Sequence, residues 1–446
     1  MPQVRRDRDR RGVVGEGILM EGERGSTSSA TTTDALRCES VPLAEIAEAV
    51  GTPAYVYSAA VVRSQYQRLS AALAPVPHRI HYSLKANSSL GLLRVLRGLG
   101  SAADVVSGGE LFRALRAGFA PGEIIFGGVG KTERELAEAV DAGVLLVNVE
   151  SERELHLLNA IAASRHAIVP IALRVNPEIT VETPHSYIRT GEKGHKFGIP
   201  YDEAREVARI ARSLPHLRLL GLDMHVGSQL SRVDAYERGL ARLLELLAQL
   251  RADGADELRY LDIGGGLAVT YDAEEPTDLA RFAEIVIPAV RQAGLQLIVE
   301  PGRWLVGNAG LLMTRVLYRK RSGGKELVVT DAGMNDLLRP SHYHAYHRID
   351  AVTPTSGTVR MDVVGPICES GDFLALDREM SDAQPGDLLV VRSAGAYGFG
   401  MASNYNSRPR AAEVLVDGDR FAVITERERY EDLVRNEPTD LDWRTV

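Results

Sequence analysis

The sequence has few cysteines, no long apolar run and no excess of positive charge. Its two cysteines, Cys38 and Cys368, stand far apart among 446 residues. That number excludes a disulfide framework and a cysteine-based zinc cluster, and it favours a reducing compartment such as the cytoplasm. No stretch reaches the length of a membrane span, and the N-terminus lacks the apolar run of a signal peptide. The net charge of −8 argues against nucleic acid or an anionic membrane as a bulk partner.

The composition is that of a soluble globular protein. Hydrophobic residues make up 45% of the chain and charged residues 25%, and the length favours two or three domains. Residues 1–33 are charged at first and then small and polar, so we predict a disordered tail with too little apolar surface to offset the entropy cost of ordering. Residues 34–58 hold a short helical pattern and a strand around Tyr55, which we assign to a later β-rich domain.

Residues 59–310 alternate regularly between strand-like and helical patterns. The helical patterns carry apolar residues at i, i+3 and i+4, and several end on glycine or proline. Eight strand–helix units of this size predict a (β/α)8 barrel of the TIM type, with an open doubly wound sheet as the alternative. The strand-like runs lie at 79–84, 103–106, 123–126, 144–148, 169–175, 217–226, 258–263 and 296–300.

Each predicted strand ends on a polar residue or a glycine. The carboxyl ends of barrel strands surround one pocket, so these residues would meet there. A loop cap or a turn explains any one of them alone, but it explains all eight together poorly. The residues are Lys85, Asp104 with Ser107, Gly127 with Gly128, Asn148, Arg174 with Asn176, His225, Gly264–Gly266, and Glu300 with Gly302 and Arg303.

After Gly310 the pattern changes to short strands separated by turn residues. Such strands recur across residues 311–446, and one helical piece lies near 336–347. We therefore predict an α/β protein in which a (β/α)8 barrel is followed by a β-rich second domain.

Lys85 is one of only six lysines in the chain. It follows the alternating run Ile80, Tyr82 and Leu84, and it precedes a turn-like stretch, residues 86–88. A lysine desolvated at the mouth of a buried strand has a lowered pKa, which frees its amine for Schiff-base chemistry. A solvated lysine at a strand end is the plain alternative.

Glycines and a carboxylate at other strand ends indicate a phosphorylated cofactor. Gly264–Gly266 follow a strand and let backbone N–H groups approach a phosphate, with Gly302 contributing from the next loop; a tight turn is the alternative. Glu300 would keep the pyridine nitrogen of pyridoxal 5'-phosphate protonated, which makes the ring an electron sink suited to decarboxylation. A salt bridge with Arg303 or Arg174 is the alternative explanation for this carboxylate.

Five further residues are candidates for ligand contacts. His225 can lie flat against a cofactor ring, although a buried histidine with a backbone partner is as common. Arg339 and Tyr343 are four residues apart, so on one helical face both can meet a ligand carboxylate. Tyr397 stands alone in a glycine- and asparagine-rich loop of the kind that surrounds ligands. Cys368 lies in a glycine-flanked loop, where it is either a buried, inert thiol or a proton donor.

Seven motifs occur in the order found in one enzyme family. They are YSLKANS, ADVVSGGEL, HVGSQ, DIGGGL, EPGR, GPICESGD and AGAYGFGMASNYNSRPR. Together, over residues 52–410, they resemble the diaminopimelate decarboxylases, which are pyridoxal-phosphate enzymes of the alanine-racemase-like fold that make lysine. The segment 184–198 also resembles the mobile loop of that family, whose closure covers the substrate.

The resemblance implies a role for each matching residue. Lys85 would carry pyridoxal 5'-phosphate, His225 would stack on its ring, and Glu300 would meet the pyridine nitrogen. The chain would form a homodimer with shared active sites, in which Cys368 returns a proton to the carbanion at the partner subunit's Lys85. The implied catalytic residues are Lys85, His225 and Cys368; the implied cofactor-binding residues are Lys85, Asp104, His225, Ser228, Gly264, Gly265, Gly266, Glu300, Gly302, Arg303 and Tyr397; the implied substrate-binding residues are Arg303, Arg339, Tyr343, Glu369 and Tyr397.

The leading hypothesis is decarboxylation of meso-2,6-diaminopimelate to L-lysine and carbon dioxide. Arg303 with Arg339 and Tyr343 favours a substrate with a second carboxylate, although Glu369 also suits a distal amine. The first alternative is the same chemistry on ornithine, arginine, carboxynorspermidine or an antibiotic precursor. An amino-acid racemase is disfavoured by Glu300, and a non-enzymatic protein that binds pyridoxal phosphate is disfavoured by the second domain.

Overall fold

A computed structural model describes residues 35–180, 185, 191, 193–353, 355 and 357–444. The tail predicted for residues 1–33 lies outside these described residues, and so do residues 184, 186–190 and 192 of the predicted mobile loop. Among the helices of the described part, none is both long enough and apolar enough to cross a lipid bilayer.

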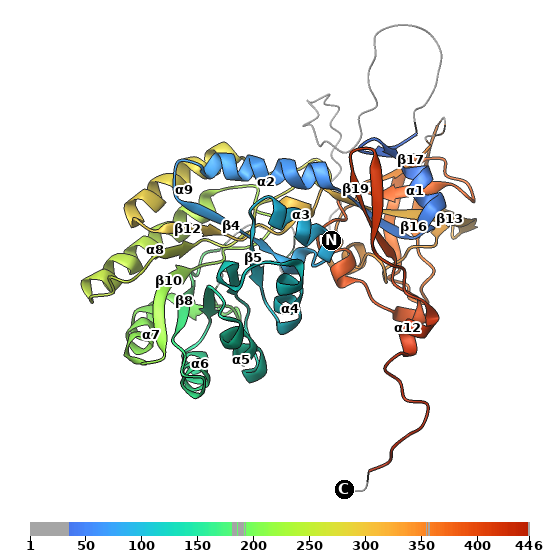
Figure 1. The fold of residues 1–446 in the computed structure, drawn as a ribbon. Coiled ribbons are helices and arrows are strands. Elements are labelled where there is room, and N and C mark those ends of the chain that lie inside the picture. The colour runs from blue at the N-terminus through green and yellow to red at the C-terminus, as the bar shows by residue number, and fades with distance from the viewer. Residues whose placement is uncertain are drawn as a thin grey trace.

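Eight parallel strands close into a barrel, as the sequence predicts (Figure 1). In order around the barrel they are β4 (His78–Ser83), β5 (Ala102–Val105), β6 (Ile124–Phe126), β7 (Leu146–Val149), β8 (Val169–Asn176), β10 (Leu217–Asp223), β11 (Tyr260–Asp262) and β12 (Gln296–Val299). The last strand pairs with the first, with Val299 opposite Ile80, and β10 pairs with both β8 and β11. The open doubly wound sheet is therefore wrong for this chain. A short extra strand, β9 (Ile199–Pro200), pairs in parallel with the end of β8.

Helices follow the strands and cover the outside of the barrel (Figure 1). Local sequence sets their ends. In α5, for example, Thr132 and Glu135 form a reciprocal capping box, and Gly143 ends the helix in the left-handed conformation. The barrel helices are α2 (Ala59–Leu73), α3 (Leu90–Gly98), α4 (Gly108–Ala117), α5 (Glu133–Ala142), α6 (Glu152–Ser164), α7 (Tyr201–Ser213), α8 (Asp234–Ala252), α9 (Leu279–Ala293) and α10 (Arg303–Val306).

The β-rich part is a mixed sheet beside the barrel, and it confirms the predicted fold class (Figure 1). Its strands are β3 (Ala54–Ser58), β13 (Gly310–Ser322), β14 (Lys325–Thr330), β15 (Ile349–Ala351), β16 (Thr358–Val364), β17 (Phe373–Ser381), β18 (Leu388–Val391), β19 (Ala412–Asp417) and β20 (Arg420–Thr425). β3 precedes the barrel in sequence, yet it lies between β13 and β19, where Tyr57 is opposite Gly310 and Leu415. The domain boundaries at residues 34–58, 59–310 and 311–446 stay predictions.

Short elements outside this sheet lie near both ends of the described chain. They are β1 (Arg37–Cys38), β2 (Val41–Pro42), α1 (Leu43–Val50) and α12 (Tyr430–Val434). Leu43 and Ile46 of α1 pack into a buried cluster with Val56 of β3 and Met313 of β13. Burial of this apolar helix face fixes the N-terminal segment on the sheet.

The helical piece predicted near 336–347 is shorter than expected. Only α11 (Arg339–Tyr343) is helical, because His344 adopts a left-handed conformation with φ 50° and ends it. Pro340 fits the first turn of this helix, where its missing N–H has no intrahelical acceptor.

A loop of the β-rich part reaches the mouth of the barrel. The backbone N–H of Tyr397 donates to the carbonyl of Ala86 at 2.8 Å. The side-chain amide of Asn87 donates back to the carbonyl of Gly395 at 3.2 Å. These contacts fix the Tyr397 loop against the turn that carries Lys85.

Candidate active site

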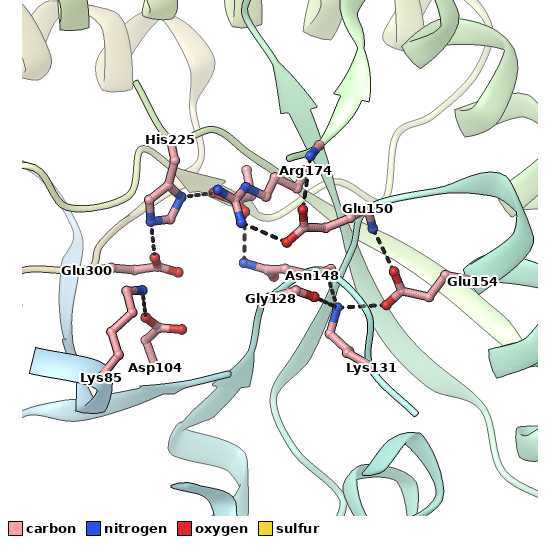
Figure 2. Close-up of polar contacts among 12 residues, drawn as sticks. Lys85, Asp104, Gly128, Lys131, Asn148, Glu150, Glu154, Arg174, His225 and Glu300 are labelled. Carbon is pink, nitrogen blue, oxygen red and sulfur yellow. Dashed lines mark hydrogen bonds and ion pairs between the residues drawn. The ribbon is translucent and has the colours of Figure 1, made fainter. Parts of the chain in front are cut away.

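Lys85 lies in a single 3-10 turn, Leu84–Ala86, directly after β4. Its Nζ is 3.0 Å from Oδ2 of Asp104 (Figure 2). Asp104 is buried in β5 and also accepts a hydrogen bond from the Ser83 hydroxyl. The Lys85 side chain keeps 37% of its surface exposed. The strand and the turn therefore present an amine that is held at one side and accessible at the other.

The pKa of Lys85 is shifted in the direction opposite to the one predicted from the sequence. Burial at the barrel mouth lowers this pKa, but the carboxylates of Asp104 and Glu300 outweigh burial, and the pKa is raised above its usual value. In turn, although burial alone would raise the pKa of Asp104, the Lys85 charge lowers it. The prediction of a lowered pKa is therefore wrong for this chain, because the carboxylates of Asp104 and Glu300 keep the amine charged.

Three buried carboxylates gather beside Lys85, at the ends of β10, β11 and β12. Asp223, Asp262 and Glu300 each offer an oxygen, and these oxygens lie within 4.8 Å of one another. Burial, and then the neighbouring Glu300 and Asp223, raise the pKa of Asp262 well above its usual range. Asp262 therefore keeps its proton to a higher pH than an exposed aspartate, which lessens the repulsion within the cluster.

His225 joins two of these carboxylates. Its Nε2 is 2.7 Å from Oε2 of Glu300, and its Nδ1 is 3.4 Å from Oδ1 of Asp223 (Figure 2). Burial alone would lower the pKa of His225, but the Glu300 carboxylate outweighs burial and raises the pKa to about 9. The ring is therefore an imidazolium at neutral pH.

The salt bridge considered as an alternative for Glu300 does not form with either arginine. Arg174 pairs instead with Glu150, at 2.7 Å between Nη1 and Oε1, and both side chains are buried. Glu150 also accepts from the backbone N–H of Gly198 at 2.9 Å. Glu300 is thus left with His225 as its ion-pair partner among the described residues.

The glycine-rich strand end has the form of an anion cradle. Gly266 has φ +101°, and a Cβ there would lie 2.5 Å from the carbonyl of Gly227. A Cβ at Gly265 would lie 2.2 Å from the carbonyl of Glu300, so no side chain fits. Within the described residues, the N–H groups of Gly265, Gly266 and Gly302 have no hydrogen-bond acceptor. Backbone N–H groups without an acceptor at a strand end suit a phosphate.

Two buried arginines complete the pocket. Arg303 begins α10 and Arg339 begins α11, and their exposed fractions are 6% and 7%. Arg303 donates to the Tyr271 hydroxyl at 2.6 Å and to the Ser228 hydroxyl at 3.1 Å, while Arg339 donates to Nε2 of His347 at 3.3 Å. All three acceptors are uncharged groups. Neither arginine has an ion-pair partner within the described part of the chain, so both positive charges are available to an anionic ligand.

The remaining aromatic candidates lie beside these arginines. The guanidinium of Arg303 lies over the Tyr397 ring at 4.8 Å, and that of Arg339 lies over the Tyr343 ring at 5.8 Å. The i, i+4 spacing therefore places Arg339 and Tyr343 together as predicted.

Cys368 and Glu369 stay apart from this cluster. Both are exposed in the loop between β16 and β17, and the Cys368 N–H donates to the Asn406 side chain at 2.8 Å. The other cysteine, Cys38, is buried, and burial raises the pKa of its thiol to about 12. Cys368 is thus the accessible thiol of the two, and the buried, inert alternative applies to Cys38 instead.

A second lysine, Lys131, is held by hydrogen bonds behind the site. The Lys131 side chain is 1% exposed, and its Nζ donates to the carbonyl of Gly128 at 2.8 Å, to the carbonyl of Asn148 at 2.7 Å and to Glu154 at 2.7 Å (Figure 2). These bonds use all three donors of the ammonium and hold the ends of β6 and β7 together. The Asn148 side chain in turn donates to Asp223 at 3.1 Å. Lys131 therefore supports one carboxylate of the site from behind.

Sequence reasoning missed several residues of this pocket. Asp223 and Asp262 each end a barrel strand, so the rule that singled out Lys85 and Glu300 applies to them as well. Tyr271 and Lys131 lie in loops with no recognisable pattern, and only tertiary contacts reveal their positions.

Comparison with known proteins assigns this chain to an enzyme class. Residues 59–307 match the family described as "Pyridoxal-dependent decarboxylase, pyridoxal binding domain", and this range contains the eight barrel strands and all of α10. The chain therefore belongs to the pyridoxal-dependent amino-acid decarboxylases.

Relatives that match over nearly their whole length make the family assignment of this chain more specific. The diaminopimelate decarboxylase of Pseudomonas aeruginosa is 47% identical over 403 residues, which cover 90% of this chain and 96% of that protein. The crystal structure of diaminopimelate decarboxylase from Helicobacter pylori, complexed with L-lysine, has a TM-score of 0.86 at 40% identity and covers 89% of this chain and 99% of that one. Within its class, this chain belongs to the diaminopimelate decarboxylase family.

A more distant structure shares the fold alone. The lysine/ornithine decarboxylase of Vibrio vulnificus, complexed with cadaverine, has a TM-score of 0.74 at 22% identity and covers 84% of this chain and 96% of that one. The same architecture therefore occurs in a decarboxylase named for other amino acids, so the identity of the substrate rests on the side chains of the pocket.

Proposed function

We propose that this protein decarboxylates meso-2,6-diaminopimelate to L-lysine and carbon dioxide with pyridoxal 5'-phosphate as cofactor. The observation that carries the proposal is the pair of buried arginines, Arg303 and Arg339, which have no acidic partner in the described chain and lie at the mouth of the barrel that holds Lys85. Two unpaired cations at this position suit a substrate that carries a second carboxylate.

The residues of the pocket fit pyridoxal 5'-phosphate. Lys85 would bind it covalently, and the N–H groups of Gly265, Gly266 and Gly302 would hold its phosphate together with the Ser228 hydroxyl. Asp104 keeps the Lys85 amine in place from the neighbouring strand. When bound, the cofactor supplies an electron sink for the electron pair left on carbon as carbon dioxide departs.

Glu300 and His225 would set the charge on the cofactor ring. A buried carboxylate at this position favours a protonated pyridine nitrogen, as decarboxylation requires and a racemase does not. His225 pairs with that carboxylate at 2.7 Å, so it would share Glu300 with the pyridine nitrogen. Asp223 holds the opposite edge of the imidazolium and limits its movement.

Arg339 would bind the distal carboxylate of the substrate, with Tyr343 and Tyr397 beside it. In an Arg339→Ala variant we expect the KM for diaminopimelate to rise about 10- to 100-fold with kcat changed far less, because a charge-assisted contact of about 1.5–3 kcal/mol is lost. Steady-state kinetics measures both constants. An unchanged KM would show that the distal carboxylate is bound elsewhere.

We further propose a homodimer in which Cys368 completes the active site of the partner subunit, and a cytoplasmic location. Cys368 is accessible, and in one chain no hydrogen bond or ion pair of the described residues links its loop to Lys85 or Glu300. Glu369, the neighbouring candidate for the substrate's distal amine, is exposed in the same loop. A second chain would bring both residues to a site that otherwise lacks a proton donor of this kind.

Cys368→Ala is expected to lower kcat by about 100- to 10,000-fold while cofactor affinity stays within about twofold, because a general acid is lost and no cofactor contact changes. Turnover and a cofactor titration measure the two effects. Cys38→Ala is the matched control, since it removes a buried thiol far from the barrel mouth. Wild-type turnover in Cys368→Ala would mean that another group donates the proton.

The proposed substrate is tested directly with purified protein loaded with pyridoxal 5'-phosphate. Meso-diaminopimelate, ornithine and arginine are supplied in parallel, and carbon dioxide and the amine product are measured. Lysine from diaminopimelate, with no product from the other two, supports the proposal. A loaded protein that ignores diaminopimelate overturns it, and release of carbon dioxide from another amino acid then identifies the alternative substrate.

A further inference from the structure

Tyr271 lies between the two buried arginines. Its hydroxyl accepts from Nη1 of Arg303 at 2.6 Å, and its ring has the Arg303 guanidinium at 5.8 Å and the Arg339 guanidinium at 5.0 Å. Burial alone would raise the pKa of the Tyr271 phenol, but the two guanidiniums outweigh it and lower the pKa below its usual value. The partial negative charges of the ring face and the hydroxyl oxygen therefore stabilise two cations that repel each other.

Arg339 is fixed on its other side by a neutral histidine. His347 is fully buried, and its Nδ1 is 2.9 Å from the carbonyl of Arg392, so Nδ1 carries the proton. Nε2 is then free to accept from Nε of Arg339 at 3.3 Å. Burial, followed by the nearby Arg339 charge, lowers the pKa of His347 to about 3, which keeps the ring uncharged. The His347 ring also meets Tyr271 edge-on, with centroids 5.2 Å apart.

This arrangement orients each guanidinium without cancelling its charge. A carboxylate in place of Tyr271 or His347 would neutralise an arginine and remove its attraction for an anionic ligand. A small apolar side chain would leave two buried cations adjacent and unsupported. A phenol and a neutral imidazole avoid both outcomes, so both positive charges stay directed at the pocket.

We infer that Tyr271 is a positioning residue that holds Arg303 and Arg339 at the spacing needed to bind the carboxylate farthest from the reacting carbon. The inference rests on the proposed function and extends it to a residue that makes the site select for a second carboxylate. Ligands that carry this carboxylate should depend on Tyr271, and ligands that lack it should not.

Two amines test this difference in binding without turnover. Removal of one carboxyl group from diaminopimelate gives L-lysine, which keeps the distal carboxylate, and cadaverine is the same chain without it. Calorimetric titration of Tyr271→Phe, loaded with pyridoxal 5'-phosphate, is expected to show about tenfold weaker L-lysine binding than wild type because Arg303 loses an oriented acceptor. Cadaverine binding and cofactor affinity are expected to stay within about twofold.

Tyr201→Phe is the matched control. Tyr201 also lies beneath an arginine, with the Arg242 guanidinium 4.2 Å from its ring, and its hydroxyl donates to the Arg242 carbonyl at 3.0 Å. It belongs to α7 on the outside of the barrel, so its substitution should leave both ligands unaffected.

The possible results separate the inference from the proposed function. Selective loss of L-lysine binding in Tyr271→Phe supports the inference. Equal weakening of both ligands would show a general packing role and overturn it, as would unchanged L-lysine binding. Weaker cofactor binding instead would assign Arg303 to the phosphate and overturn it as well. None of these outcomes depends on whether diaminopimelate is turned over. The turnover of diaminopimelate is a separate measurement, and it tests the proposed function.

Discussion

Lys85→Ala is expected to lower the turnover of diaminopimelate by at least about a thousandfold and to remove the visible absorbance of the lysine-bound cofactor. The reason is chemical, since the covalent bond to the cofactor needs this amine. Lys131 also lies near these strand ends, but all three of its N–H donors are engaged. Absorbance spectra of the loaded protein and steady-state kinetics measure the two effects.

Noncovalent cofactor binding should survive in this variant, because the N–H groups of Gly265 and Gly266 and the Glu300 carboxylate are unchanged. Lys320→Ala serves as the control, since Lys320 is exposed on β13, away from the barrel mouth. A Lys85→Ala protein that keeps the lysine-bound absorbance would refute the assignment of Lys85.

Lys131→Ala is expected to lower the free energy of unfolding by about 3–5 kcal/mol, the cost of leaving a buried carboxylate and two carbonyls without their cation. Glu154 would lose its ammonium, and the ends of β6 and β7 would lose the bridge between them. Urea denaturation followed by tryptophan fluorescence can measure this change. Trp304 is 1% exposed and reports on the barrel, whereas Trp443 is 86% exposed and is already in water.

Lys320→Ala again provides the comparison, because an exposed lysine is expected to change stability by no more than about 0.5 kcal/mol. If Lys131→Ala and Lys320→Ala unfold at the same urea concentration, the clamp contributes nothing to stability. If Lys131→Ala is both destabilised and slower in turnover, the link through Asn148 to Asp223 also acts on the site.

The barrel could be predicted because its information is local. Strand-like and helical periodicities alternate eight times, and caps such as Thr132 with Gly143 mark where a helix begins and ends. The short α11 could not be delimited in this way, because its end depends on the left-handed backbone of His344. Closure of the barrel also had to be observed, since it depends on the pairing of β12 with β4, which are far apart in sequence.

The candidate site likewise has residues that could be predicted from the sequence and features that could not. The rule that functional residues follow barrel strands brings Lys85, Asp104, His225 and Glu300 together, and the structure places them side by side. The raised pKa of Lys85 could not be predicted, because it results from carboxylates on other strands. The role inferred for Tyr271 could not be predicted either, because it depends on arginines from two separate helices, α10 and α11. Cys368 stays a prediction that needs a second subunit.

The position of β3 has a consequence for how the chain is made. This strand leaves the ribosome before the whole barrel, but both strands that flank it, β13 and β19, are synthesised after the barrel. Tyr57 of β3 hydrogen-bonds to Glu413, which lies 356 positions later. Throughout most of translation, Ala54–Ser58 is therefore an apolar segment with two unpaired edges. Chaperones bind segments of this kind, and such segments also tend to aggregate. The nascent barrel can close early, but the sheet beside it can only be completed near the end of synthesis.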